Sequence, residues 1–160
     1  MSKSVLLDTS FFIRMLNKED SLHLSAFSYY KYFLENQFTL KISTITIAEY
    51  CVRGRVSDLP FKDLRIVPFN YNHAVRTGEF ANVLFIKNKK IEDKLKPRFI
   101  IPNDSKLFAQ ADVDEFTQYF VTSDTSSLKA HSMLKTELNP NFEIIDIHLP
   151  CNEFFMRLDL

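Results

Sequence analysis

The chain has 160 residues, of which 46% are hydrophobic and 25% charged, so we expect one globular domain spanning residues 1–160. Its 20 Lys and Arg residues balance 20 Asp and Glu residues, which excludes a generally basic nucleic-acid-binding body and leaves only a local patch for any RNA contact. With only two glycines, Gly54 and Gly78, the chain can form neither a dinucleotide-binding fingerprint nor a P-loop.

Cysteine and histidine spacing argues against a disulfide framework and against zinc. Cys51 and Cys151 lie far apart, and none of the histidines is followed four residues later by another. The apolar run Val5–Leu7 is interrupted by Asp8, so it is too short for a secretion signal. No stretch is long and apolar enough for a membrane span. We therefore expect a cytoplasmic, reduced protein without a membrane partner.

Short apolar runs alternate with helical patterns along the chain. Strands are expected at residues 5–7, 38–43, 65–69, 119–122 and 142–147. Helices are expected at residues 11–16, 22–36, 44 or 46 to 51 or 52, 59–64, 70 or 72 to about 90, from 103–104 onward, and 125–138. The tail after Pro150 is expected to pack on the body. This alternation predicts an α/β fold of three layers, in which about five mainly parallel strands are flanked by helices.

Four carboxylates fall at positions where the pattern predicts burial or half-burial. Asp8 and Asp124 follow the first and fourth strands, so both are expected at the edge where the carboxyl ends of the strands meet. Glu49 is the only acid in an apolar helix, and Asp104 opens a helix beside its apolar face. Each acid also has a plainer role open to it, because three of them can cap helices and Glu49 can pair with Arg53.

Gathered in one cleft, these carboxylates would repel one another by several kcal/mol per pair, about 4 kcal/mol at 4 Å and an effective dielectric of 20. Such a cluster persists if some members are protonated or if cations neutralise it. Oxygen ligands favour one or two Mg²⁺ or Mn²⁺ ions. The reaction that suits an all-acid site is hydrolysis of a phosphodiester.

Four segments together resemble the successive motifs of PIN-domain nucleases, a family that includes the VapC-like toxins of bacterial toxin–antitoxin pairs. The segments are Leu6–Ile13, Ser43–Glu49, Pro102–Ala111 and Val121–Asp124, and the helix around Arg76–Ala81 also fits. The resemblance covers nearly the whole chain in the expected order. It implies a five-stranded parallel sheet flanked by helices and a metal-dependent endoribonuclease.

Residue by residue, the resemblance assigns the catalytic and metal-binding roles to Asp8, Glu49, Asp104 and Asp124. Hydroxyl groups of Thr9 or Ser10 and of Thr122 or Ser123 would hydrogen-bond those ligands. Water would attack the scissile phosphorus in line while a carboxylate accepts its proton. The resemblance also implies a cognate antitoxin whose C-terminal segment crosses the cleft, and a homodimer is possible by the same analogy.

Other functions compete with this interpretation. The main alternative is a catalytically inactive PIN-like module that binds RNA or acts as a scaffold. A haloacid-dehalogenase-type phosphatase needs a second Asp where Ser10 stands, and a receiver-like domain needs an acid paired with Asp8. The segment Lys87–Arg98 holds six Lys and Arg residues and two acids, which suits either an RNA contact or a solvated loop.

Overall fold

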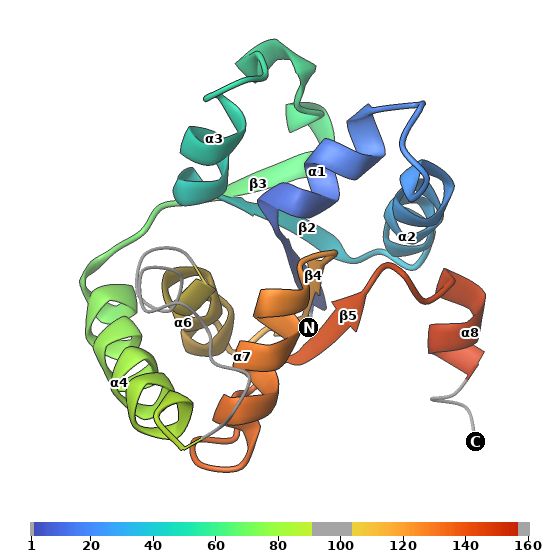
Figure 1. The fold of residues 1–160 in the computed structure, drawn as a ribbon. Helices are drawn as coiled ribbons and strands as arrows, with labels where there is room; N and C mark the ends of the chain where they lie inside the picture. The colour runs from blue at the N-terminus through green and yellow to red at the C-terminus, as the bar shows by residue number, and fades with distance from the viewer. Residues whose placement is uncertain (1, 91–103, 157–160) are drawn as a thin grey trace.

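The computed structural model describes residues 2–90 and 104–156, and its centre is one parallel sheet (Figure 1). The strands are β1 (Ser4–Leu7), β2 (Thr39–Ser43), β3 (Leu64–Val67), β4 (Thr117–Thr122) and β5 (Glu143–Asp146). Their order is β3-β2-β1-β4-β5, and every pair is parallel. This arrangement confirms the predicted α/β fold class. All carboxyl ends of the strands lie at one edge of the sheet, which we call the carboxyl edge; the opposite one is the amino edge.

Helices connect the strands and cover both faces of the sheet (Figure 1). They are α1 (Thr9–Leu16), α2 (His23–Glu35), α3 (Thr44–Tyr50), α4 (Tyr71–Asn88), α6 (Ser105–Val113), α7 (Thr125–Lys135) and α8 (Cys151–Met156). Most expected helices are confirmed to within a few residues. The helix expected to continue to residue 138 ends at Lys135. The helix expected from Phe11 already begins at Thr9, because Asp8 rather than Thr9 or Ser10 caps it.

The helix expected at residues 59–64 is wrong. The 3₁₀ turn Phe61–Asp63 stands there instead, a second such turn, Val56–Asp58, precedes it, and β3 already begins at Leu64. Pro60 separates the turns, and its missing N–H cannot donate to a continuing helix. Leu59, between the turns, is buried and belongs to the core.

Successive side chains of the central strands pack into two separate hydrophobic cores, one on each face of the sheet. Val5 and Leu7 of β1 pack against α1 and α2, whereas Leu6 faces the opposite core under α4, α6 and α7. The neighbouring strand repeats the pattern, with Val121 on the first side and Phe120 on the second. Such strands, buried on both faces, read as continuous apolar runs in the sequence. The short run Val5–Leu7 was therefore enough to locate the central strand.

The amino edge carries a cluster of aromatic rings that fixes the C-terminal helix. Phe155 of α8 stacks on Tyr32 of α2 with 3.9 Å between ring centroids. Phe38, just before β2, lies 5.3 Å from Phe33 and 6.1 Å from Tyr119 of β4. The prediction that the tail packs on the body is confirmed for α8. Over the described parts of the chain, no helix combines the length and apolar character needed to span a bilayer.

Candidate active site

Asp8 is the central acid of the carboxyl edge. It follows β1 directly and caps α1, with Oδ1 accepting a hydrogen bond from Thr9 N at 2.8 Å. Its Oδ2 accepts hydrogen bonds from the hydroxyls of Thr122 at 2.7 Å and Ser10 at 2.9 Å. Only 7% of Asp8 is exposed, and this burial raises the pKa of its carboxyl group despite the hydrogen bonds, with a smaller contribution from Glu49.

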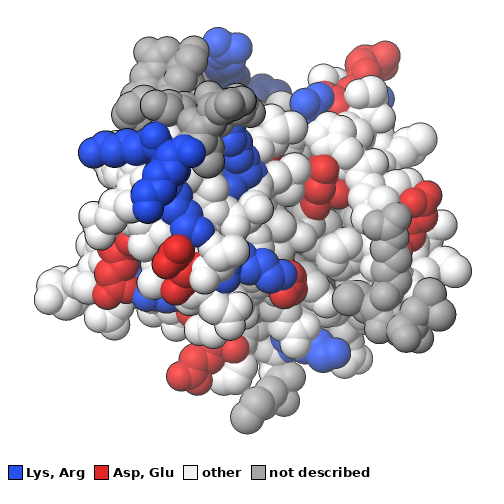
Figure 2. All heavy atoms as spheres, turned by 60° about the horizontal axis from the view of Figure 1, so that its bottom comes forward, with Lys and Arg blue, Asp and Glu red and all other residues white. Residues whose placement is uncertain are grey.

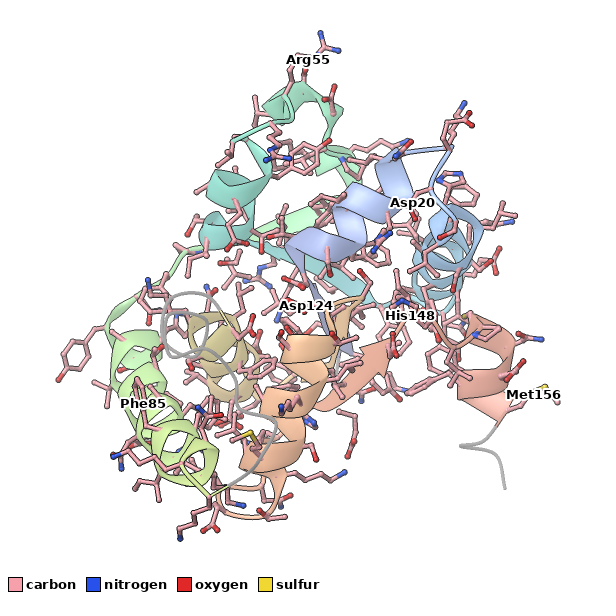
Figure 3. All side chains as sticks on the ribbon, viewed as in Figure 1. Asp20, Arg55, Phe85, Asp124, His148 and Met156 are labelled. Atoms are coloured by element: carbon pink, nitrogen blue, oxygen red, sulfur yellow. The ribbon has the colours of Figure 1, made fainter. Side chains whose placement is uncertain are left out.

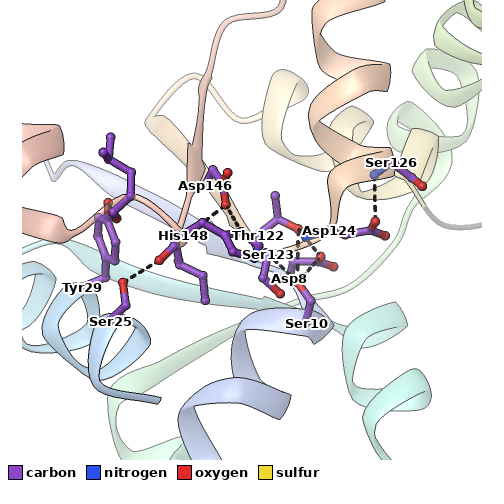
Figure 4. Close-up of polar contacts among 12 residues, drawn as sticks. Asp8, Ser10, Ser25, Tyr29, Thr122, Ser123, Asp124, Ser126, Asp146 and His148 are labelled. Carbon is purple, nitrogen blue, oxygen red and sulfur yellow. Dashed lines mark hydrogen bonds and ion pairs between the residues drawn. The ribbon is translucent and has the colours of Figure 1, made fainter. Parts of the chain in front are cut away.

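The same hydroxyls join the ends of β1 and β4. The Ser10 and Thr122 hydroxyl oxygens are 3.1 Å apart, and Ser10 Oγ accepts from the backbone N–H of Ser123 at 2.9 Å. Thr122 Oγ1 in turn accepts from Asp124 N at 3.0 Å, so the loop that carries Asp124 is fixed relative to Asp8 (Figure 4). Ser123 takes part through its backbone and Thr122 through its side chain.

Asp124 is exposed and caps α7, with Oδ1 accepting from Ser126 N at 2.9 Å. Figure 3 places it between the ends of the sheet and the start of α7. The capping role considered from the sequence is therefore real for both Asp8 and Asp124. It occupies one oxygen of Asp124 and does not withdraw the carboxylate from solvent.

Glu49 lies half-buried on α3, one strand away from Asp8. The Thr9 hydroxyl donates a short hydrogen bond to Glu49 Oε2, which ties α3 to the start of α1. The alternative pairing with Arg53 is not formed within the described residues. Thr9 therefore positions Glu49, while Ser10 and Thr122 position Asp8.

Asp104 immediately precedes α6, and its pKa is raised to about 7. Burial is the largest cause, followed by repulsion from Asp8 and Asp124 and, more weakly, from Glu49, while Ser127 opposes the shift. Its side chain makes no capping hydrogen bond to α6 in the described backbone, so the cap considered from the sequence is absent. All four acids thus share one electrostatic environment at the carboxyl edge.

The chemistry of these donors fits a hard divalent cation, because all of them are carboxylate oxygens, and burial together with the neighbouring acids raises the pKa of Asp104. Their present arrangement is looser than a finished metal site. Across residues 2–90 and 104–156, no three or more acidic, histidine or cysteine side chains converge into a ready-made ligand group.

A groove of about 620 Å³ opens beside Glu49. It lies between α1 and α3, and Ile13, Leu16, Tyr50 and Arg53 line it together with Thr9 and Glu49. Gly54 also lines the groove, and a Cβ added there would lie 2.4 Å from the nearest carbon of the Tyr50 ring, so that ring would have to move. Of the four acids, Glu49 is therefore the one that borders a mainly apolar recess.

Positive charge gathers elsewhere on the surface. In Figure 2, Lys and Arg side chains cluster beside the grey residues on one side of the view. Residues 91–98 of the predicted basic segment Lys87–Arg98 lie outside the described residues. Of the described part, Lys87 contacts the Thr136 hydroxyl and pairs with Glu137 at 3.4 Å.

Sequence reasoning missed two polar features near this edge. Gln110 of α6 is buried, accepts from Ser43 Oγ at 2.5 Å and donates to Val67 O at 3.2 Å, which links α6 to β2 and β3. Asp146 ends β5 and contacts His148. The rule that selected Asp8 and Asp124 also selects Asp146, because it stands at a strand's carboxyl end.

Solved structures share this fold. A chain of the VapBC2 complex from Rickettsia felis, bound to a DNA fragment from its promoter, aligns with TM-score 0.59 and 22% identity over 89% of this chain and 98% of that one. The DNA-bound VapBC of Salmonella typhimurium aligns with TM-score 0.58 and 18% identity over 92% of this chain and 99% of that one. Mycobacterium tuberculosis VapC20, described as a toxin that cleaves the sarcin–ricin loop, aligns with TM-score 0.53 and 16% identity over 79% of this chain and 95% of that one. No family model matches the sequence, and no curated protein is similar to it.

Proposed function

We propose that this chain is a divalent-metal-dependent endoribonuclease and acts as the toxin of a toxin–antitoxin pair. The observation that carries the proposal is the shared environment of Asp8, Glu49, Asp104 and Asp124: burial first, and then repulsion from the other three acids, raises the pKa of Asp104 to about 7. Repulsion among buried carboxylates lowers the stability of a fold, whereas in a cation-binding site the same negative charge attracts the ion. The fold shared with the VapC20 toxin supports the same reaction class.

The four acids would hold one or two Mg²⁺ or Mn²⁺ ions. When bound, such an ion supplies Lewis-acid stabilisation of the phosphodiester and neutralises the carboxylates. Ser10 and Thr122 fix the orientation of Asp8, and Thr9 fixes that of Glu49, so few side-chain rotations remain to be restricted when substrate binds. A carboxylate of this set accepts the proton of the attacking water.

The proposed partners are an RNA substrate and a cognate antitoxin. Two of the structures with this fold, those from Rickettsia felis and Salmonella typhimurium, are VapBC complexes. The groove beside Glu49 is the recess in which we expect the antitoxin segment, since an apolar surface there adjoins one of the four acids. A homodimer is proposed by the same analogy.

RNA cleavage is the direct test. A mixed pool of structured and single-stranded RNA is incubated with wild type, Asp8→Asn and Glu115→Gln in Mg²⁺, Mn²⁺ or EDTA. Glu115 is an exposed acid before β4 at the amino edge, so Glu115→Gln is the control for lost charge. We expect cutting by wild type and Glu115→Gln, none with EDTA, and a loss of at least a thousandfold in Asp8→Asn, on the order seen when catalytic groups are removed.

The principal alternative, an inactive RNA-binding or scaffolding module, makes a different prediction for the same assay. RNA would be bound but not cut under any metal condition, and Asp8→Asn would bind it as wild type does. Cutting that survives EDTA, or that persists in Asp8→Asn, would contradict the proposed chemistry.

A further inference from the structure

The pair Asp146–His148 lies at the same edge as the acids and has no part in the function proposed so far. Asp146 ends β5 and stands in register with Thr122, the residue whose hydroxyl donates to Asp8. Neighbouring strands are about 4.8 Å apart. Asp146 therefore sits one strand beyond the Asp8 network, as Figure 4 shows.

The imidazole of His148 is oriented by Asp146. His148 Nδ1 lies 2.6 Å from Asp146 Oδ1, and the backbone N–H of His148 donates to the same oxygen at 3.0 Å. With the proton on Nδ1 the contact is a hydrogen bond, and with the ring doubly protonated it is an ion pair. In both forms Nε2 is turned away from the carboxylate, and 47% of the side chain is exposed to solvent.

The backbone around His148 is held on both sides. Ser25 Oγ donates to Ile147 O at 2.6 Å, and Tyr29 Oη donates to Leu149 O at 2.7 Å, so α2 fixes the carbonyls before and after this residue. Ile147 N donates to Thr122 O at 3.1 Å, which extends the pairing with β4. An exposed imidazole on an immobilised turn is arranged for contact with a ligand, because little entropy is lost when the contact forms.

Charge indicates which ligand. Along the edge, Glu49 follows β2, Asp8 follows β1, Asp124 follows β4 and His148 follows β5, in the spatial order of the strands. All of the first two residues after each strand are described, and among them only His148 can carry positive charge. Arg53, further along the chain after β2, lines the groove on the Glu49 side, so His148 is the cationic group on the β5 side of this row. A row of acids repels the phosphates of RNA except where a cation intervenes, whereas an imidazole N–H donates to a phosphate oxygen.

We propose that the doubly protonated ring of His148 donates Nε2–H to a phosphate of the RNA strand on the β5 side of the acids, with Asp146 accepting from Nδ1 as the positioning residue that orients the ring. This inference rests on the proposed function, since it names a substrate contact of the same site. His148 then contributes to RNA affinity, and the acids carry out the reaction.

Binding and cleavage are measured together to test this contact. A short fluorescein-labelled single-stranded RNA of mixed sequence is titrated in EDTA with wild type, His148→Ala, His148→Gln, Asp146→Asn and Lys62→Ala. Lys62→Ala removes an exposed cation just before β3 at the amino edge and serves as the charge control. KM and kcat are then measured in Mg²⁺, and folding is checked by thermal unfolding.

We expect His148→Ala to bind the RNA about tenfold more weakly and to raise KM by a similar factor, with kcat within about twofold of wild type, as for one lost hydrogen bond to a charged group. His148→Gln keeps a donor at the position of Nε2 and recovers most of the affinity. Asp146→Asn loses less, about threefold, because the ring remains in place but is less well oriented. Lys62→Ala matches wild type.

Two results would overturn the inference while leaving the nuclease intact. In the first, wild type cuts RNA and a folded His148→Ala has the same KM and affinity. In the second, His148→Gln is as weak as His148→Ala, which would mean that a donor at this position is not what matters. A wild type that neither binds nor cuts RNA would remove the proposed function, and this contact with it.

Discussion

The two edges of the sheet are built from opposite kinds of side chain. At the amino edge, aromatic rings of Tyr32, Phe33, Phe38, Tyr119 and Phe155 pack against one another at centroid distances from 3.9 to 6.5 Å. At the carboxyl edge, acids and small hydroxyl side chains take their place, and Asp104 is held near neutrality by burial and like charge. The aromatic edge stabilises the fold. The acidic edge destabilises it while its carboxyl groups are ionised, and binding a proton or a cation would remove this cost.

Breaking the aromatic edge should have the largest effect on stability. Phe33 of α2 is fully buried and contacts the rings of Phe38 and Phe155. Phe33→Ala should lower the free energy of unfolding by about 3–5 kcal/mol, because both burial and packing are lost. Urea unfolding measures this, with Phe27→Ala as the control, since Phe27 on the same helix is 45% exposed. An equal loss in both variants would contradict the assignment of the core.

Raising the pH should lower the free energy of unfolding, because carboxyl groups at the acidic edge become ionised. The pKa of Asp104 is about 7 in the folded state against a usual 3.8, so the folded state binds the proton more tightly than the unfolded chain. Stability therefore falls as pH rises from about 4 to about 7, by on the order of 2–4 kcal/mol, and buried Asp8 acts in the same direction.

Urea unfolding in EDTA across this pH range checks the effect. Asp104→Asn should flatten the profile and make the protein more stable than wild type at pH 7.5, because the repelled charge is gone. If the wild-type profile rises through this window, the acids do not repel one another as described.

Removing the hydroxyl that joins the two strands at the acidic edge should have an intermediate effect. Thr122→Val keeps the shape of the side chain but deletes the donor to Asp8 and the acceptor for Asp124 N. We expect a loss of about 1–2 kcal/mol in unfolding free energy. Thr122→Ser restores the hydroxyl and should recover most of the loss; equal losses in both would assign the effect to packing.

Gly78 offers a change that should touch neither edge. It lies inside α4, and an added Cβ would meet nothing within 4 Å. Gly78→Ala should raise stability by about 0.5–1 kcal/mol through helix propensity, with RNA cleavage unchanged. The thermal midpoint measures this small gain, and a decrease would mean that the helix is packed more tightly there than described.

The central strands and most helices were predictable from the sequence because β1 is buried on both faces and the buried residues of the helices recur every three to four positions. Continuous apolar runs such as Val5–Leu7 and the spacing of Phe80 and Leu84 along α4 report that burial directly. Residues 59–64 were mispredicted, since a proline in a short segment fits a first helical turn or a 3₁₀ turn equally well.

Only some of the residues at the site could be predicted from the sequence. Asp8 and Asp124 were found because they follow strands, and the helix-capping role considered for both from the sequence is confirmed. Gln110 could not be found, since its partners Ser43 and Val67 O are distant in sequence and meet only through packing. Asp146 and His148 could have been selected because they stand at the carboxyl end of a strand. The backbone around His148 is held by Ser25 and Tyr29 of α2, however, and these contacts could not be predicted.

Calorimetric titration of Mn²⁺ at pH 7.5 is the most direct test of the central claim, that the acids at the carboxyl edge form a cation site. It needs no knowledge of the RNA sequence. We predict binding to wild type and to Glu115→Gln, and affinity at least tenfold weaker in Asp8→Asn, whose side chain cannot supply a carboxylate. Absence of binding to wild type, or equal affinity in Asp8→Asn, would contradict the claim.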